Sequence, residues 1–310
     1  MTRASDQQLQ PGSTLDAAPT DTTPAAPPSP APEPASSATG EPRLIALLNQ
    51  KGGVGKTTTA VSVGAALART GQRVLMVDLD PQAHLTLSLG LEPSELNKSI
   101  YHLLVERETS AAQIVQQIAD NVGVLPAEVN LAGVEGELAD RIATGAAQTI
   151  LRNKCADLVR QFDYVIIDCP PSLGLLTVNA LTLAKEVIVP MQAHFLALQG
   201  LSKLLETVQM VREGINDKLV VSGIVLCMHE SQTILASEVA GDLRSFLEEA
   251  RGSDEPWSEA ILFEPPIRRN IKLAESPSFG QPIFDYAPES HGAADYAKLA
   301  ASIAAHRVAK

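Results

Sequence analysis

The chain has 310 residues, of which 45% are hydrophobic and 19% charged, and its formal net charge is −12. This is the composition of a globular protein with a sizeable core, and its acidity excludes an obviously basic nucleic-acid binder. The cysteines, Cys155, Cys169 and Cys227, lie far apart, which excludes a disulfide framework and indicates buried thiols in a reducing compartment. The sequence has no apolar run of the ~18 residues that a membrane span needs and no apolar signal core after Met1, so we expect a cytoplasmic protein.

The region 1–42 differs in composition from the rest of the chain. It is rich in proline, alanine, serine and threonine, most densely over residues 24–34. Such a segment has too little apolar surface to offset the entropy lost on ordering. We therefore predict a disordered tail over residues 1–42, followed by a single folded domain over residues 43–310.

A glycine-rich loop over residues 49–59 is the strongest local pattern. It follows an apolar run, 44–48, that predicts a buried strand, and it precedes a helical pattern over 60–69. Strand, glycine loop and helix together are the context of a phosphate-binding loop. Gln50 occupies the position of the first glycine in the G-x-x-x-x-G-K-[ST] pattern, so the loop departs from the ordinary form.

The residue types in this loop suit phosphate chemistry. Gly52, Gly53 and Gly55 carry no side chains, so backbone N–H groups can turn toward an anion. The start of the following helix adds its positive end. Lys56 can reach the β- and γ-phosphates of a nucleotide, and the Thr57 hydroxyl can bind Mg²⁺. The loop therefore predicts a nucleotide site.

A second apolar strand, 73–78, ends at Asp78 and is followed by Asp80 and Gln82. Strands that are apolar throughout and alternate with helices indicate a parallel sheet with helices on both faces. Ligands collect at the carboxyl ends of such strands, so we expect Asp80 near the phosphate loop. An acidic residue there aids magnesium or holds an attacking water; the alternative is that Asp80 only starts a turn before Pro81.

The apolar run 162–168 predicts a third strand, which ends at Asp168. An acidic residue at the end of an apolar strand is the Walker B arrangement, and it would hold magnesium through the water shell of the ion. Pro170 and Pro171 follow almost directly and predict a stiff turn. Such a turn suits a switch segment that moves as a unit between nucleotide states.

The remaining patterns complete an α/β chain. Residues 91–150 indicate a peripheral helical excursion, with a helix near 101–104 and a short strand near 122–126. The expected fold is a mostly parallel, twisted sheet with helices on both faces, as in P-loop NTPases. Apolar spacing further predicts helices over 175–184, 198–211, 234–247 and 292–305, and strands over 186–190, 219–228 and 282–285.

Several separated motifs occur along the folded part. They are 51–58, 77–82, 166–172, 195–201, 269–278 and 291–293. Together these segments resemble the ParA/Soj family of partition ATPases over residues 43–305. The second loop lysine, Lys51, resembles the signature of the deviant Walker A ATPases, the group to which that family belongs.

The resemblance implies roles for individual residues. Lys51 resembles the lysine that reaches the nucleotide of the opposite subunit, and Asp80 resembles the residue that positions the hydrolytic water, so these two are the implied catalytic residues. Thr57 and Asp168 are the implied magnesium ligands. The implied nucleotide-binding residues, in the loop and in the walls of the adenine pocket, are Lys51, Gly52, Gly53, Val54, Gly55, Lys56, Thr57, Thr58, Met228, Pro266, Ile267, Arg268 and Asn270.

The resemblance also implies a functional cycle. ATP and Mg²⁺ are the expected cofactors, and ATP drives formation of a homodimer. The dimer is expected to bind double-stranded DNA of the nucleoid without sequence preference. A ParB-type centromere-binding protein is expected to stimulate its slow ATP hydrolysis. The implied location is the cytoplasm, in association with the nucleoid and not with a membrane.

The residues expected to contact DNA depart from the family pattern. Gln232 and Glu289 stand where arginines are expected, and Lys272 replaces a second arginine with a point charge. Fewer cations weaken a surface that binds phosphates. The candidate DNA contacts in this sequence are Arg244, Arg269 and Lys272.

Alternative functions differ in the features that they require. A MinD-like ATPase would need a C-terminal amphipathic helix for membrane, whereas residues 296–310 are rich in alanine with few large apolar side chains. A redox carrier like the nitrogenase iron protein would need bridging cysteines, and Cys169 alone lies beside a predicted switch. A scaffold that binds ATP without hydrolysing it would not need both Asp80 and Asp168.

Overall fold

The computed structural model describes residues 40–194, 197–230 and 233–307. The predicted disordered tail therefore lies outside the described residues except for positions 40–42, and Gln232 lies outside them as well. Over these described ranges, none of the helices combines the length and the apolar character needed to cross a bilayer.

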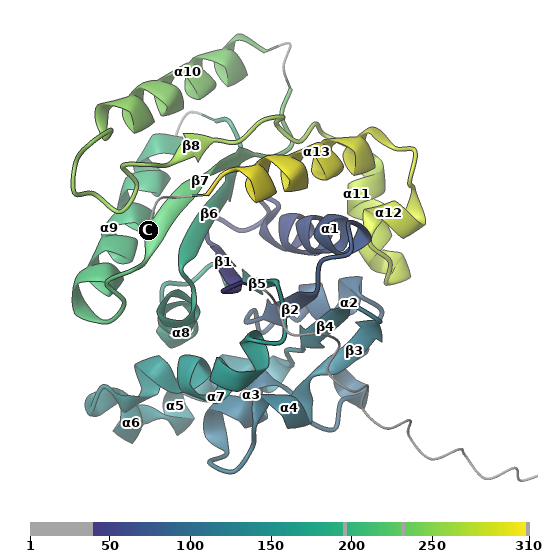
Figure 1. The fold of residues 1–310 in the computed structure, drawn as a ribbon, viewed down its shortest axis with the longest axis vertical. Coiled ribbons are helices and arrows are strands. Elements are labelled where there is room, and N and C mark those ends of the chain that lie inside the picture. Colours follow the sequence, from purple (N-terminus) through teal and green to yellow (C-terminus); the bar gives the residue numbers. More distant parts are fainter. Residues whose placement is uncertain (1–39, 195–196, 231–232, 308–310) are drawn as a thin grey trace, which may run out of the picture. The chain divides into compact units, whose positions relative to one another are not determined.

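One sheet organises the described part of the chain (Figure 1). Its strands lie in the order β3-β4-β2-β5-β1-β6-β7-β8, and neighbouring strands are parallel except for β3 and β4. The predicted mostly parallel α/β sheet is thus confirmed. The strands are β1 Arg43–Leu47, β2 Val74–Asp78, β3 Gln116–Ala119, β4 Val122–Leu125, β5 Tyr164–Asp168, β6 Glu186–Met191, β7 Val220–Leu226 and β8 Ile261–Leu262.

Helices cover both faces of this sheet, because successive residues of a strand point to opposite faces. In β1, Leu44 and Ala46 pack into one core, whereas Ile45 and Leu47 pack into the other. Helices α1 and α13 lie side by side over the second core (Figure 1). The helices are α1 Lys56–Arg69, α2 His84–Ser88, α3 Ile100–Val105, α4 Ala111–Ile114, α5 Val134–Glu137, α6 Ala139–Ala143, α7 Ile150–Val159, α8 Leu175–Leu183, α9 Ala197–Gly214, α10 Ile234–Glu249, α11 Ile271–Glu275, α12 Ile283–Tyr286 and α13 His291–Ala305.

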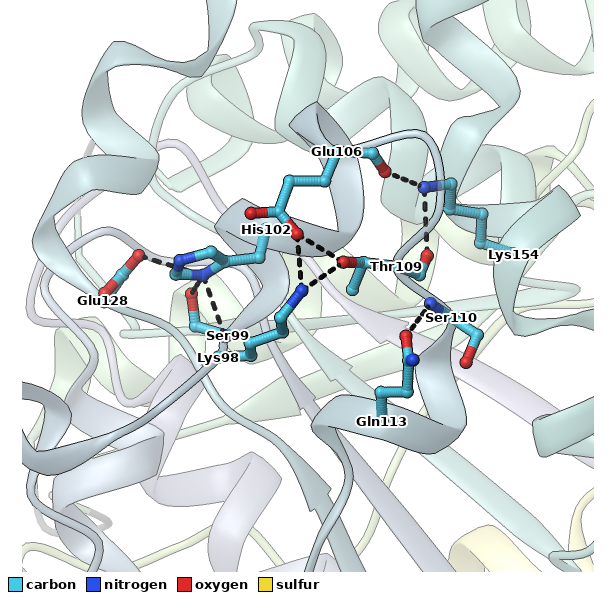
Figure 2. Close-up of polar contacts among 9 residues, drawn as sticks. All are labelled: Lys98, Ser99, His102, Glu106, Thr109, Ser110, Gln113, Glu128 and Lys154. Atoms are coloured by element: carbon cyan, nitrogen blue, oxygen red, sulfur yellow. Dashed lines mark hydrogen bonds and ion pairs between the residues drawn. The ribbon is translucent and has the colours of Figure 1, made fainter.

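Polar contacts hold the helical excursion between β2 and α7 in place (Figure 2). Lys98, which precedes α3, donates from Nζ to Glu106 Oε2 at 2.6 Å and to Thr109 Oγ1 at 2.7 Å, and both acceptors lie between α3 and α4. Lys154 of α7 donates to the carbonyl oxygens of Glu106 and Thr109. The excursion is therefore tied to α7 by side chains whose partners are distant in sequence, which apolar spacing cannot predict.

One predicted strand is wrong. Residues 282–285 belong to helix α12, because the N–H groups of Asp285 and Tyr286 both donate to Pro282 O at 3.0 Å. Proline is well suited to the start of a helix, since its φ is already helical and its missing N–H is not needed there. Ile283 and Phe284 are consecutive and both buried, which a half-exposed strand does not allow.

Two edge strands carry too little pattern to be predicted. β3 has four residues and pairs antiparallel with β4, and β8 has only two residues. The other predicted helices and strands are confirmed, with ends that shift by a few residues. Thus long apolar segments are predictable here, and short edge elements are not.

Candidate phosphate-binding site

Neighbouring parallel strands bring the predicted acidic residues together with the glycine loop. β5 lies between β1 and β2, and its last residue, Asp168, is paired with Leu47 of β1 and with Asp78 of β2. The loop leaves β1 at the same edge of the sheet and leads into α1. The carboxyl edge therefore gathers the phosphate loop and the acidic strand ends, as the sequence predicts.

The backbone of the loop adopts a conformation that requires glycine. Gly53 and Gly55 have φ values of 70° and 94°, in the left-handed region. A Cβ atom at Gly55 would also lie 3.3 Å from Cys227 Cβ. Gly55 is the N-cap of α1, and its carbonyl accepts a helical hydrogen bond from Thr59 N at 2.9 Å. The free N–H groups of the first turn of α1 then form a site that favours an anion.

Lys56 supplies a positive charge at this helix start. The residue is only 7% exposed, and its Nζ lies 3.4 Å from the carbonyl oxygen of Lys51. Burying an ammonium group against a neutral carbonyl is unfavourable unless an anion compensates its charge. The position of Lys56 therefore supports a phosphate ligand at the start of α1.

Thr57 and Asp168 form a hydrogen-bonded pair that suits magnesium. Thr57 Oγ1 donates to Asp168 Oδ2 at 2.6 Å, and Asp168 is fully buried. The second carboxylate oxygen, Oδ1, has no hydrogen-bond partner among the described residues. A buried polar atom normally has a partner, and Mg²⁺ binds through one or two protein oxygens while keeping several waters. The pair fits that ion, although the described part of the chain holds no cluster of three histidine, cysteine or acidic residues.

Burial changes the protonation of both strand-end carboxylates. It raises the pKa of Asp168 to about 8, and the charge of Asp78 adds to this rise. Burial also raises the pKa of Asp78 to about 6, although Thr86 donates to Asp78 Oδ2 from its N–H and its hydroxyl. A divalent cation favours the ionised form of a nearby carboxylate. A divalent cation bound at this edge of the sheet would therefore lower the pKa values of both carboxyl groups and keep them ionised.

Asp80 lies on the turn after β2, where local hydrogen bonds hold it. Its N–H donates to Asp78 Oδ1 at 3.1 Å, and its Oδ1 accepts from Gln82 N at 3.0 Å. Asp80 lines the same cavity as the phosphate loop and as Pro171 of the stiff turn after β5. A carboxylate at this place can orient a water next to a bound phosphate.

An open cavity of about 900 Å³ extends from the phosphate loop. Among its lining are these residues that the sequence singled out: Gly52, Gly53, Gly55, Lys56, Thr57, Thr58, Asp80 and Met228. Further walls, which were not predicted from the sequence as site residues, come from α2 and the residues after it and from α11 and the residues after it: His84, Leu87, Ser88, Gly90, Leu91, Glu92, Leu273, Ala274, Pro277, Ser278 and Gly280. Leu273, Ala274, Pro277 and Ser278 lie in the family motif over 269–278, whereas residues 87–92 carry no signal that would have marked them.

The predicted adenine-pocket segment, 266–270, lies beside the cavity and not in its described lining. Pro266, Ile267, Arg268 and Asn270 are absent from the described residues that line the cavity. Ile267 is 2% exposed and packs in the core, and Arg268 forms an ion pair with Asp295 at 2.6 Å. Of the residues predicted for the adenine pocket, the structure therefore brings Met228 to this cavity.

Lys51 and Val54 line a smaller recess against the turn after β6. The Lys51 side chain is exposed, and its Nζ lies 2.7 Å from His194 Nε2. Val54 is buried. The two lysines of the phosphate loop thus have different surroundings, since Lys56 lines the cavity and Lys51 lines the recess.

The candidate DNA contacts all form ion pairs within the chain. Arg244 pairs with Glu264 at 2.8 Å. Arg269 pairs with Glu230 at 3.0 Å and Lys272 with Glu275 at 2.9 Å. Glu289 is exposed, as expected for a surface residue.

The chain is similar in sequence to a family model and to proteins of known class. Residues 42–221 match the family model described as AAA domain. The sporulation initiation inhibitor protein Soj of Bacillus subtilis is 40% identical over 264 residues, which are 85% of this chain and 99% of Soj. The chromosome partitioning protein ParA of Caulobacter vibrioides is 37% identical, over 84% of this chain and 93% of its own.

A solved structure shares the same fold. It is the crystal structure of cobyrinic acid a,c-diamide synthase from Mycobacterium smegmatis with bound ADP and magnesium. It has a TM-score of 0.71 and 36% identity, and the match covers 86% of this chain and 95% of that one. This similarity shows that the two chains share the arrangement of the sheet and the phosphate loop. The enzymatic activity in the name of that structure is a property of the Mycobacterium smegmatis protein.

The parallel sheet, the phosphate loop and the acidic strand ends define a P-loop ATPase of the AAA domain family. Within this class, the chain belongs to the ParA/Soj family of partition ATPases. The family resemblance and the fold class predicted from the sequence are both confirmed.

Proposed function

We propose that this chain is a partition ATPase that binds ATP with Mg²⁺ and hydrolyses it slowly. The observation that carries the proposal is the 2.6 Å hydrogen bond between Thr57 and Asp168, whose free oxygen is buried beside the phosphate loop. The Mycobacterium smegmatis structure, 36% identical, contains ADP and magnesium. That observation supports the same pair of ligands for the site described here.

The proposed roles follow from position. Loop N–H groups and Lys56 hold the phosphates, because a helix start and an ammonium group both favour anions. Thr57 binds magnesium directly, and Asp168 binds it through water. Asp80 orients the attacking water, since it lines the cavity on the side of the strand ends. The further proposed nucleotide contacts are Gly52, Gly53, Val54, Gly55, Thr58, Met228, Pro266, Ile267, Arg268 and Asn270.

The finer part of the proposal concerns partners. Lys51 reaches the nucleotide of a second subunit, which is supported by its exposed side chain outside the cavity of its own subunit. The ATP-bound dimer binds nucleoid DNA without sequence preference through Arg244, Arg269 and Lys272. A ParB-type protein accelerates hydrolysis and releases the dimer, while the chain acts in the cytoplasm through its domain over 43–310.

Two substitutions test the core of the proposal. Lys56→Ala removes the ammonium group that would contact the phosphates. We therefore expect neither ATP binding nor dimer formation. Asp80→Ala leaves the phosphate loop intact, so we expect normal ATP binding and a dimer that persists because hydrolysis stops. Fluorescent nucleotide titration, gel filtration and phosphate release measure these properties. Hydrolysis by Asp80→Ala at the wild-type rate would contradict the catalytic assignment.

A further experiment addresses the partners. Phosphate release is measured with ATP alone, with plasmid DNA, with the ParB-type protein of the same genome, and with both. We expect the largest rate with both, because the proposed switch is completed only by its partners. Equal rates in all four conditions would contradict partner stimulation and leave an independent ATPase.

A further inference from the structure

The phosphate loop contains two lysines, and only Lys56 lies at the cavity. Lys51 is the first residue of the loop motif, yet its ammonium group contacts His194, with 2.7 Å between Lys51 Nζ and His194 Nε2. Both residues line the recess formed by the loop, the end of β6 and the start of α9. His194 is not one of the described residues that line the cavity.

The end of β6 and the turn after it contact the loop at two further points. Asn49 Nδ2 donates to Pro190 O at 2.8 Å, and Asn49 Oδ1 accepts from Lys51 N at 2.9 Å. Gln192 Nε2 donates to Gly53 O at 3.1 Å. The backbone of the loop before Gly55 is therefore held against residues 190–194. These contacts keep the backbone segments that carry Lys51 and His194 next to each other.

We propose that His194 is a positioning residue that holds Lys51 in the recess of its own subunit until a second subunit arrives. The inference rests on the proposed function, in which Lys51 acts on the nucleotide of the neighbouring subunit. Formation of the dimer then requires that the contact between Lys51 and His194 breaks. His194 sets how readily the lysine is released, and it does not touch the reacting atoms.

The chemistry of the contact explains why release is possible. A lysine ammonium group only donates hydrogen bonds, so His194 Nε2 is the acceptor and the imidazole is neutral, with its proton on Nδ1. A neutral acceptor holds the ammonium group by a hydrogen bond without the attraction of an opposite charge. A carboxylate at this position would form an ion pair and hold Lys51 more strongly. A side chain without an acceptor would not hold it at all.

Three substitutions at residue 194 test this proposal through the rate of dimer formation after addition of a non-hydrolysable ATP analogue. His194→Ala removes the acceptor, so we expect association to become faster, by about tenfold for a contact of ordinary strength. His194→Glu should slow association by a similar factor. His194→Gln retains an acceptor oxygen and should behave like the wild type. Association is followed by energy transfer between labelled subunits.

The control is ADP affinity of the separate subunits, which should be the same in all three variants because His194 lies outside the cavity lining. Structural damage would slow association in every variant. Changes in opposite directions for His194→Ala and His194→Glu therefore identify positioning. If both variants change the rate in the same direction, or neither changes it, the proposal is wrong. Should His194→Ala fold poorly, the Glu and Gln variants still provide the comparison.

The Lys51→Ala variant separates this proposal from the proposed function. If Lys51→Ala does not form dimers while the His194 variants match the wild type, the role of Lys51 stands and the role of His194 is overturned. If Lys51→Ala forms dimers like the wild type, both the cross-subunit role of Lys51 and its control by His194 are overturned. If Lys51→Ala blocks association and the His194 variants shift its rate oppositely, both are supported.

Discussion

The carboxyl edge of the central strands and the C-terminal segment 264–290 differ in how well the roles of their residues could be predicted from the sequence. At the strand edge, the backbone places Thr57 and Asp168 next to each other, because the parallel register of β1 and β5 fixes where each strand ends. In the C-terminal segment, surface side chains find partners from other parts of the chain, such as Arg269 with Glu230. Roles that depend on backbone position are therefore predictable from a motif, and roles that depend on side-chain partners are not.

The largest expected effect comes from removing the buried charge at the strand edge. Lys56→Ala should weaken ATP binding about a thousandfold or more, or about 4 kcal/mol, because a charged contact to the phosphates is lost in a buried place. Isothermal titration calorimetry measures the affinity. Lys298→Ala, an exposed lysine of α13, is the matched control and should bind like the wild type. An affinity loss below tenfold for Lys56→Ala would remove this residue from the phosphate site.

A second prediction concerns the pH dependence of stability without nucleotide. Burial raises the pKa of Asp78 from 3.8 to about 6, so between these values the folded chain keeps a proton that the unfolded chain releases. The free energy of unfolding contributed by Asp78 is therefore present at low pH and is lost as pH rises through about 6. Compared with Asp78→Asn, the wild type should lose about 2.4 kcal/mol from pH 4 to 7, because the shift from 3.8 to about 6 acts mainly in this range.

Urea unfolding at a series of pH values measures this difference. Asp78→Asn cannot release a proton at this position, so its own change over the range comes from the other titratable groups, among them Asp168, which loses the part of its pKa rise that the charge of Asp78 contributes. A constant difference between the two proteins would show that Asp78 is ionised in the folded state throughout. Asp163→Asn is a useful comparison, because its Arg73 partner lowers the pKa of that carboxyl and the sign of its contribution is opposite.

Individual residues show which parts of the site and of the fold could be predicted from the sequence. Asp168 and the glycine loop were predictable because long apolar strands precede them, and strand ends meet at one edge of a parallel sheet. The cavity walls at Leu87 and Leu91 were not predictable, since the short helix α2 and the residues that follow it carry no motif. Residues 282–285 were predicted as a strand from apolar character alone, which does not separate a short strand from one helical turn.

The glycines of the loop provide a smaller and sharper test. Gly55→Ala places a side chain at a φ of 94° and against Cys227, so we expect a loss of about 1–3 kcal/mol in the free energy of unfolding and weaker ATP binding. Gly52→Ala is the matched variant, because its φ is not in the left-handed region and a Cβ there meets nothing within 4 Å among the described residues. It should unfold like the wild type in thermal melts. Equal destabilisation by both would contradict the backbone argument.

The smallest effect is expected at the C-terminal surface, where acidic partners neutralise the candidate DNA contacts. Glu230→Gln frees Arg269 and Glu275→Gln frees Lys272. Each change should raise the affinity of the ATP-bound form for plasmid DNA by about two- to fivefold at low salt, because an exposed cation becomes available to a phosphate.

Glu95→Gln supplies the control, since it changes the net charge equally at an exposed site of another segment. Fluorescence anisotropy with labelled duplex at several salt concentrations measures the affinities, and the salt slope should steepen by roughly one for each freed cation. If Glu95→Gln increases the affinity as much as the other two variants, the gain reflects net charge alone. The DNA would then bind elsewhere, and the ion pairs of Arg269 and Lys272 would be structural.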